Sequence, residues 1–395
     1  MSQSGFFFDI VNVALVLALI AFAQYRYHLR WWIVLLLLFH FSLVFLTNGV
    51  LFPPSYMPDQ LLYLNLAQQV RGTAETAILG PNRFGVDLAG FFFGYFPIPV
   101  IDSVYSIAII NFILYLILFI FLKEKGMLEG VSLWVFLLYP SLLLYTSISL
   151  RDTFILFFMT LGLWFYTRGR VLPAILIQLP LIFLKLQNLG IFAFSLALFL
   201  LIAIFFPRVA RRRVPFIVAI AFLALLAAAL PFAYKYGLKG LNLYRHLFWL
   251  EDMGLSKLTP VNPATQIGSV PQLLLETARS IPYFLLKPMP WEARNPLQLI
   301  QSLENLVVAF LVIRVIWKAY RNRATTPAMH FLLVLFIASL AVYGLTVWNF
   351  GTAVRYKFPY VTLFLVFYPR LSALRTGGRE LSGEAAPQGL EALRG

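Results

Sequence analysis

The strongest constraint in this sequence is a series of apolar runs, each near the length of about 20 residues that a helix needs to cross a bilayer. Hydrophobic residues make up 61% of the chain and charged residues 12%. A water-soluble fold cannot cover so much apolar surface with so few charges. The sequence therefore predicts an all-α polytopic protein with about eleven transmembrane helices. The expected spans are 8–24, 31–51, 103–122, 131–149, 153–166, 171–186, 189–206, 214–232, 304–317, 328–348 and 357–371.

Basic residues follow every second expected span. Lys and Arg collect in cytoplasmic loops, so this pattern places the N-terminus outside and the C-terminus in the cytoplasm. The net charge of +15 then reports membrane topology, and nucleic acid is not an expected partner. The basic boundaries include Arg26 and Arg30, Lys123 and Lys125, Arg168 and Arg170, Arg211 to Arg213, Lys318 and Arg321, and Arg370 and Arg375.

We expect a single transmembrane domain over residues 1–372, with two long outer loops at 52–102 and 233–303, and a disordered cytoplasmic tail at 373–395. In the first loop, Asp59 opens the helical pattern DQLLYLNLAQQV. A second apolar stretch at 84–99, FGVDLAGFFFGYFPIP, is bounded by Pro and fits a helix lying in the membrane interface. The first outer loop is therefore predicted to contain two juxtamembrane helices.

The second outer loop contains the segment LLKPMPWEARNP, in which three prolines hold Lys287, Trp291 and Glu292 in a rigid turn. An aromatic ring beside charged groups at membrane level suits contact with a sugar or a lipid headgroup. A simple interfacial anchor is the equally weighted alternative.

Three short outer connections carry polar groups that hydrocarbon does not tolerate without a reason. By the predicted topology, all three open on the same side as Asp59. Each has a structural alternative, because Lys and Arg reach towards interfaces and Asp152 can pair with Arg151. These residues are Arg151 and Asp152; Lys185 and Gln187; and Asn349, Arg355, Tyr356 and Lys357.

Arg and Lys side chains are suited to binding a phosphate or diphosphate, and a nearby carboxylate can act as a general base on a hydroxyl. Together they predict transfer of a group from a lipid-phosphate donor. The chain has no Cys, its four His are scattered, and it contains neither a Walker loop nor an Asp-x-Asp pair. No cofactor is therefore required by the sequence; a divalent metal is not indicated, although it remains open.

The segments PDQLLYLNLA, YPSLLLYTSISLRD and NFGTAVRYKFP resemble elements of the GT-C superfamily of integral membrane glycosyltransferases and of bacterial envelope-polysaccharide polymerases. The resemblance implies a sugar donor on a polyprenyl phosphate or diphosphate and an essential acid in the first large outer loop, here Asp59. It also implies that Arg151 and Arg355 hold the lipid phosphate. The chain departs from the GT-C pattern by one extra N-terminal span and by the lack of a second acid beside Asp59.

The sequence thus predicts a glycosyltransferase of the bacterial inner membrane, with a GT-C-like helical bundle and a periplasmic site. Asp59 is the expected base, and Arg151, Arg355, Lys185 and Lys357 bind phosphate. The acceptor is a glycan or a second lipid-linked sugar. Two alternatives remain, a repeat-unit polymerase or ligase in which Asp59 is only a helix cap, and a flippase for lipid-linked sugars. The supporting residues are Asp152, Gln187, Asn349, Tyr356, Trp291 and Glu292.

Overall fold

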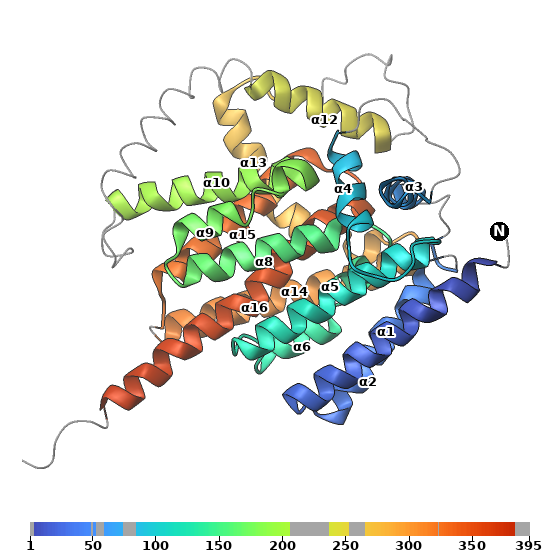
Figure 1. Ribbon diagram of the computed structural model, residues 1–395. Coiled ribbons are helices and arrows are strands. Elements are labelled where there is room, and N and C mark those ends of the chain that lie inside the picture. Colours follow the sequence, from blue (N-terminus) through green and yellow to red (C-terminus); the bar gives the residue numbers. More distant parts are fainter. Residues whose placement is uncertain are drawn as a thin grey trace, which may run out of the picture. The chain divides into compact units, whose positions relative to one another are not determined.

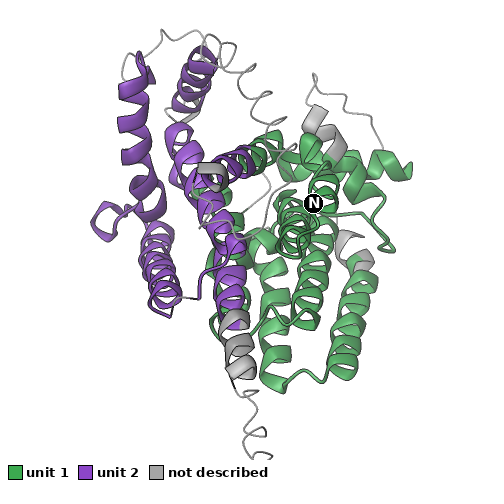
Figure 2. Cartoon of the chain, turned by 90° about the vertical axis from the view of Figure 1, so that its left-hand side faces the viewer, with its two compact units in different colours: residues 1–193, 351–362 green, residues 194–350, 363–395 purple. Residues whose placement is uncertain are grey.

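The structure of the protein is a computed structural model, and it describes residues 4–48, 50–52, 59–73, 84–205, 237–252, 265–322 and 324–383. Helices account for nearly all regular structure in these residues (Figure 1). The chain divides into two compact units, one formed by residues 1–193 and 351–362 and the other by residues 194–350 and 363–395 (Figure 2).

The first unit holds the N-terminal helices, together with the beginning of α10 and residues 351–362, about the first three turns of the last helix. Its helices are α1 (Ser4–Tyr27), α2 (Trp31–Thr47), α3 (Asp59–Arg71), α4 (Phe84–Gly94), α5 (Val104–Glu124), α6 (Val131–Leu138), α7 (Pro140–Ser147), α8 (Asp152–Thr167), α9 (Val171–Leu176) and the start of α10 (Leu181–Phe205).

The second unit contains the helices of the long loop 233–303 and most of the C-terminal helices. They are α12 (Leu238–Asp252), α13 (Val270–Leu286), the short 3-10 helix η3 (Pro290–Glu292), α14 (Pro296–Arg321), α15 (Pro327–Thr346) and most of α16 (Phe350–Gly383).

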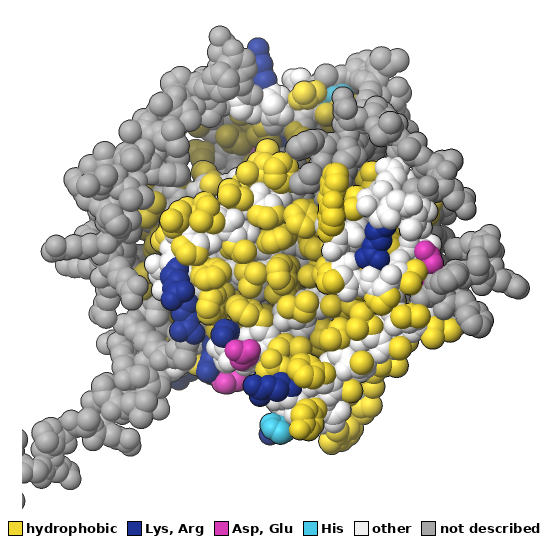
Figure 3. Space-filling view, in the orientation of Figure 1, with side chains coloured by type: hydrophobic (Ala, Val, Ile, Leu, Met, Phe, Trp, Pro, Cys, Tyr) yellow, Lys and Arg dark blue, Asp and Glu magenta, His cyan; other side chains and the backbone are white. Residues whose placement is uncertain are grey.

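Several helices are long and apolar enough to cross a membrane. In the described part of the chain there are five, and α7 with α8 forms a sixth candidate that is bent by 120°. Hydrophobic side chains cover most of the described surface in Figure 3, as lipid-facing surface requires. These helices indicate a membrane-embedded protein but do not account for about eleven spans. The expected span 214–232 lies outside the described residues.

Three predicted boundaries differ from the structure. The span expected at 131–149 is two helices, since Pro140 lacks the backbone N–H that a continuous helix needs. The turn expected around Lys185 and Gln187 is a kink within α10, at which the backbone of Lys185 leaves helical geometry (φ −167°, ψ 86°). The predicted tail begins as helix, because α16 continues to Gly383.

Both helices predicted for the first outer loop are present, as α3 and α4, and they pack closely. A Cβ atom on Gly90 would lie 2.3 Å from the Cβ of Leu66, so only glycine allows this approach. Arg71, the last residue of α3, donates hydrogen bonds to the carbonyl oxygens of Gly94 (2.9 Å) and Phe96 (2.6 Å). The guanidinium therefore satisfies the free carbonyls after α4 and holds the two helices as one hairpin.

The turn that joins α7 to α8 has its backbone carbonyls satisfied by two buried asparagines. Asn111 on α5 donates from Nδ2 to the oxygens of Ile148 (2.6 Å) and Leu150 (2.7 Å). Asn48, at the end of α2, donates to the oxygen of Ser147 (2.7 Å). Non-helical backbone in an apolar environment is stable only when such groups are paired. These bonds fix the start of α8.

The close contact between α3 and α4 predicts different responses to alanine at two helical glycines. Gly90→Ala should destabilise the protein by about 1–3 kcal/mol, because the added methyl overpacks against Leu66. Gly190→Ala on α10 is the control, since a Cβ there meets nothing within 4 Å and alanine favours the helix. Thermal unfolding in detergent measures both. Equal midpoints for the two variants would contradict the packing described for the hairpin.

Candidate active site

Arg355 lies between two carboxylates from distant parts of the first unit. Its Nε donates to Oδ2 of Asp152 at 2.7 Å, across 203 residues of sequence. Its Nη1 lies 3.9 Å from Oδ2 of Asp59. The side chain of Asp152 is only 3% exposed, whereas that of Asp59 is 37% exposed. The structure thus brings three of the predicted polar segments together around one guanidinium.

All three side chains sit near the N-terminal ends of helices. Asp59 is the first residue of α3, Asp152 is the first residue of α8, and Arg355 lies in the second turn of α16. Free backbone N–H groups and the helix dipole make such ends electropositive. They stabilise the two carboxylates, and where helix ends converge they also favour an anionic ligand.

Lys185 belongs to the same region through its contact with α16. Its Nζ lies 2.9 Å from the centre of the Tyr356 ring, a cation–π contact. Three residues further along α10, Oδ1 of Asn188 accepts a hydrogen bond from the hydroxyl of Tyr360 at 3.2 Å. The break in α10 therefore faces the first turns of α16, on which Lys357 is buried. Four predicted polar segments, including this one, meet within the first unit.

Tyr63 is a residue of the site that the sequence patterns did not identify. It lies one turn after Asp59 on α3 and is fully buried, and its hydroxyl has no hydrogen-bond partner in the described part of the chain. Burial raises the pKa of Tyr63 to about 12, and the charges of Arg151, Arg355, Asp59 and Asp152 also act on it. The phenol is therefore neutral at physiological pH and lies among the charges of the site. Its i+4 spacing from Asp59 was the signal available in the sequence.

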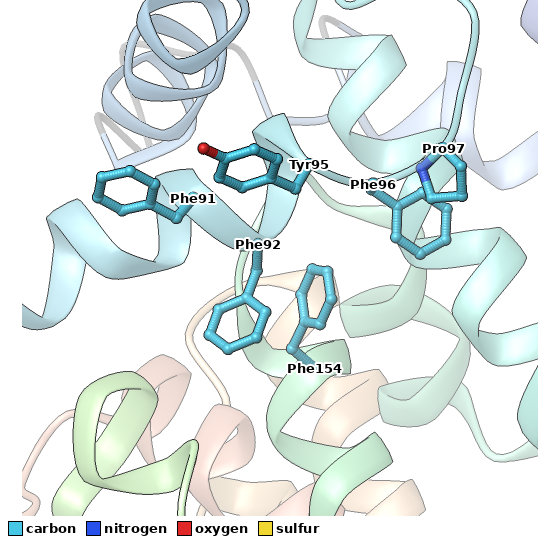
Figure 4. A pocket seen from close by; sticks show the side chains of 6 residues that line it. All are labelled: Phe91, Phe92, Tyr95, Phe96, Pro97 and Phe154. Carbon is cyan, nitrogen blue, oxygen red and sulfur yellow. The ribbon is translucent and has the colours of Figure 1, made fainter.

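An apolar groove lies beside the charged cluster. It has a volume of about 480 Å³ and is formed by the end of α4, the residues after it and α8 (Figure 4). Phe154, which follows Asp152 by two residues, packs on Phe92 and on Phe93, whose ring in turn lies 5.8 Å from that of Tyr63. The groove and the charges thus share the first turn of α8. The lining residues are Phe91, Phe92, Tyr95, Phe96, Pro97 and Phe154.

The remaining predicted residues are distributed over both units. Arg151 directly precedes Asp152 as the N-cap of α8, and Gln187 lies on the outer surface of α10. Asn349, Trp291 and Glu292 belong to the second unit.

Glu292 is bound within its own turn. It accepts hydrogen bonds from the ammonium of Lys287 and from the backbone N–H of Met289, and the bond to Lys287 lowers the pKa of its carboxyl. Trp291 beside it is 80% exposed. The predicted rigid turn is present, and its exposed indole fits either a headgroup contact or an anchor.

No protein-family model, curated protein or solved structure matches this chain. Over the residues that the structure describes, no three His, Asp or Glu side chains are grouped so that they could hold a metal ion. The fold and the site define a membrane-embedded helical protein in which an Arg–carboxylate cluster lies beside an apolar groove.

The buried ion pair predicts a large loss of stability when its acid is neutralised. Asp152→Asn leaves the guanidinium of Arg355 without its charged partner, and we expect the free energy of unfolding to fall by about 3 kcal/mol. Asp102→Asn, at an exposed acid of the same unit just before α5, is the matched control and should change little. Thermal unfolding in detergent compares the two.

The double variant Asp152→Asn with Arg355→Gln should recover part of the lost stability, because no uncompensated charge remains buried. If Asp152→Asn and Asp102→Asn unfold at the same temperature, the ion pair does not stabilise the first unit as described.

Proposed function

We propose that this protein is a glycosyltransferase of the bacterial inner membrane, of the GT-C type, that uses a polyprenyl-phosphate or polyprenyl-diphosphate sugar at the periplasmic face in cell-envelope glycan assembly. The observation that carries the proposal is the position of Arg355 between Asp59 and Asp152. This arrangement places in one site a carboxylate that solvent can reach and cations that can bind a phosphate.

The two carboxylates have different roles in this proposal because their surroundings differ. Asp59 is 37% exposed and makes only a long contact of 3.9 Å with Arg355, so an acceptor can reach it. Asp152 is 3% exposed and accepts a hydrogen bond from Arg355 at 2.7 Å, so it is shielded from an acceptor. Asp59 is therefore the general base, and Asp152 positions Arg355.

The proposed reaction is a direct displacement at the anomeric carbon. The acceptor hydroxyl gives its proton to the carboxylate of Asp59, and its oxygen forms the new bond to the anomeric carbon. The bond from that carbon to the phosphate oxygen breaks, and its electron pair stays on the phosphate. Arg151 and Arg355 stabilise the charge that develops there, with Lys185 and Lys357 adding positive potential. Such a displacement inverts the anomeric configuration.

The apolar groove supports a lipid-linked donor over a soluble one. An amphiphile with an anionic head and a hydrocarbon chain needs cations and an apolar surface side by side. The aromatic groove supports that combination, because Phe93 packs both on Phe154 in the groove wall and on Tyr63, one turn after Asp59.

Asp59→Asn should reduce sugar transfer by about 100-fold or more, because the amide cannot accept the proton of the acceptor. The purified protein is assayed in liposomes with a polyprenyl-phosphate sugar and with a polyprenyl-diphosphate oligosaccharide, each with EDTA and with Mg²⁺. Asp102→Asn is the matched control and should retain full turnover. Full turnover by Asp59→Asn would contradict the assignment of the base.

The same assay separates the alternatives. Product ladders that survive Asp59→Asn but disappear with Arg355→Ala would indicate a repeat-unit polymerase or ligase. Movement of intact donor between leaflets without turnover would indicate a flippase. Arg170→Ala, an exposed arginine of the same unit, controls for loss of positive charge.

A further inference from the structure

The inward face of α3 holds two buried polar side chains, Gln60 and Tyr63. Among the residues that the structure describes, the hydroxyl of Tyr63 and both amide atoms of Gln60 have no hydrogen-bond partner, and each side chain is fully buried. Buried polar groups are nearly always hydrogen-bonded, because leaving them unpaired is costly. Two such side chains on one helix, next to the charged cluster at Asp59, therefore indicate a ligand that forms hydrogen bonds with them.

The two residues share one face of the helix. Positions 60 and 63 are separated by three residues, which places their side chains side by side on α3. The ring of Tyr63 is fixed by its contact with Phe93, 5.8 Å between centroids. Asp59, directly before Gln60, is 37% exposed. This end of the buried face thus adjoins a position that a ligand can reach.

The charges around Tyr63 indicate what kind of ligand fits. Arg151 and Arg355 are the cations that act on its hydroxyl, and burial keeps that hydroxyl protonated. The phenol O–H of Tyr63 is a hydrogen-bond donor, and Arg151 and Arg355 add positive potential at its position. Phosphate oxygens accept several hydrogen bonds and carry the negative charge that two arginines favour.

We propose that Tyr63 is a ligand-binding residue whose hydroxyl donates a hydrogen bond to the phosphate group of the lipid-linked donor, next to Arg151 and Arg355, and that the amide of Gln60 supports the same group. This inference rests on the proposed function and adds to it two phosphate contacts that the sequence patterns did not identify.

The test measures binding without catalysis. A short polyprenyl phosphate that carries no sugar is titrated into the purified protein in detergent by calorimetry, and inorganic phosphate is titrated separately. Tyr63→Phe keeps the ring but removes the hydroxyl, and it should weaken binding of the lipid phosphate about tenfold, the usual worth of a hydrogen bond to a charged group. Weakened binding of inorganic phosphate as well would show that the head group suffices without the chain.

Tyr115→Phe is the matched control. Tyr115 is equally buried in the same unit, but its hydroxyl donates to the carbonyl oxygen of Phe136 at 2.8 Å. This variant should bind the lipid phosphate normally and unfold at a lower temperature. Tyr63→Phe should show the reverse, with weaker binding and an unchanged or higher unfolding temperature, because the hydroxyl that it removes has no partner in the free protein.

The proposal is overturned if Tyr63→Phe binds lipid phosphate as the wild type does, if it unfolds earlier as Tyr115→Phe does, or if the wild type binds no phosphate. It is also overturned if Tyr63→Phe raises only the KM for the sugar-loaded donor, because the hydroxyl then contacts the sugar. Binding that depends on Tyr63 in a protein without sugar transfer would support this site and refute the proposed reaction. If the wild type transfers sugar and Tyr63→Phe binds the lipid phosphate normally, the result would support the proposed reaction and refute this site.

Discussion

The ion pair between Arg355 and Asp152 joins the first turns of α16 to the start of α8, and the arrangement of the candidate site depends on it. A guanidinium away from water is stable only when its charge and its N–H groups are matched. Once Asp152 has fixed Arg355, the other side of the same guanidinium faces Asp59. The buried Asp152 thereby fixes the position of the guanidinium that the exposed Asp59 contacts. Removing Asp152 would therefore disturb both the fold and the site.

Hydrogen bonds to the turn before α8 also fix the start of this helix. Asn48 and Asn111 bind carbonyl oxygens of the turn before Arg151, so that a break in helical backbone carries few unpaired groups. The hairpin of α3 and α4 is fastened by Arg71 in the same way. Several polar side chains of the first unit thus satisfy backbone groups, and others gather around Arg355. Among the described residues, the hydroxyl of Tyr63 has no hydrogen-bond partner.

The site combines the charged cluster around Arg355 with the apolar groove, and this combination restricts the kinds of ligand that can bind there. A free sugar phosphate would leave the groove beside Phe154 empty, and a neutral lipid would not engage the cations around Asp59. An anionic head on a hydrocarbon chain satisfies both. The pairing of Arg355 with Asp152 also means that Arg355 brings less net positive charge to a ligand than an isolated arginine would. Arg151, Lys185 and Lys357 therefore matter for the overall positive potential.

The sequence by itself determined the class of protein and the positions of its polar segments along the chain. Apolar runs and sparse charge are properties of composition and periodicity, so the helical membrane fold, the two helices of the first loop and the polar positions from Asp59 to Arg355 could be predicted. Only the tertiary structure decided which of them pair, because contacts across some 200 residues leave no local pattern. It also decided that the break at Lys185 is a kink within α10, where Asn188 and Lys185 contact residues of α16. The role inferred for Tyr63 depends on burial, which the sequence of an aromatic-rich chain does not reveal.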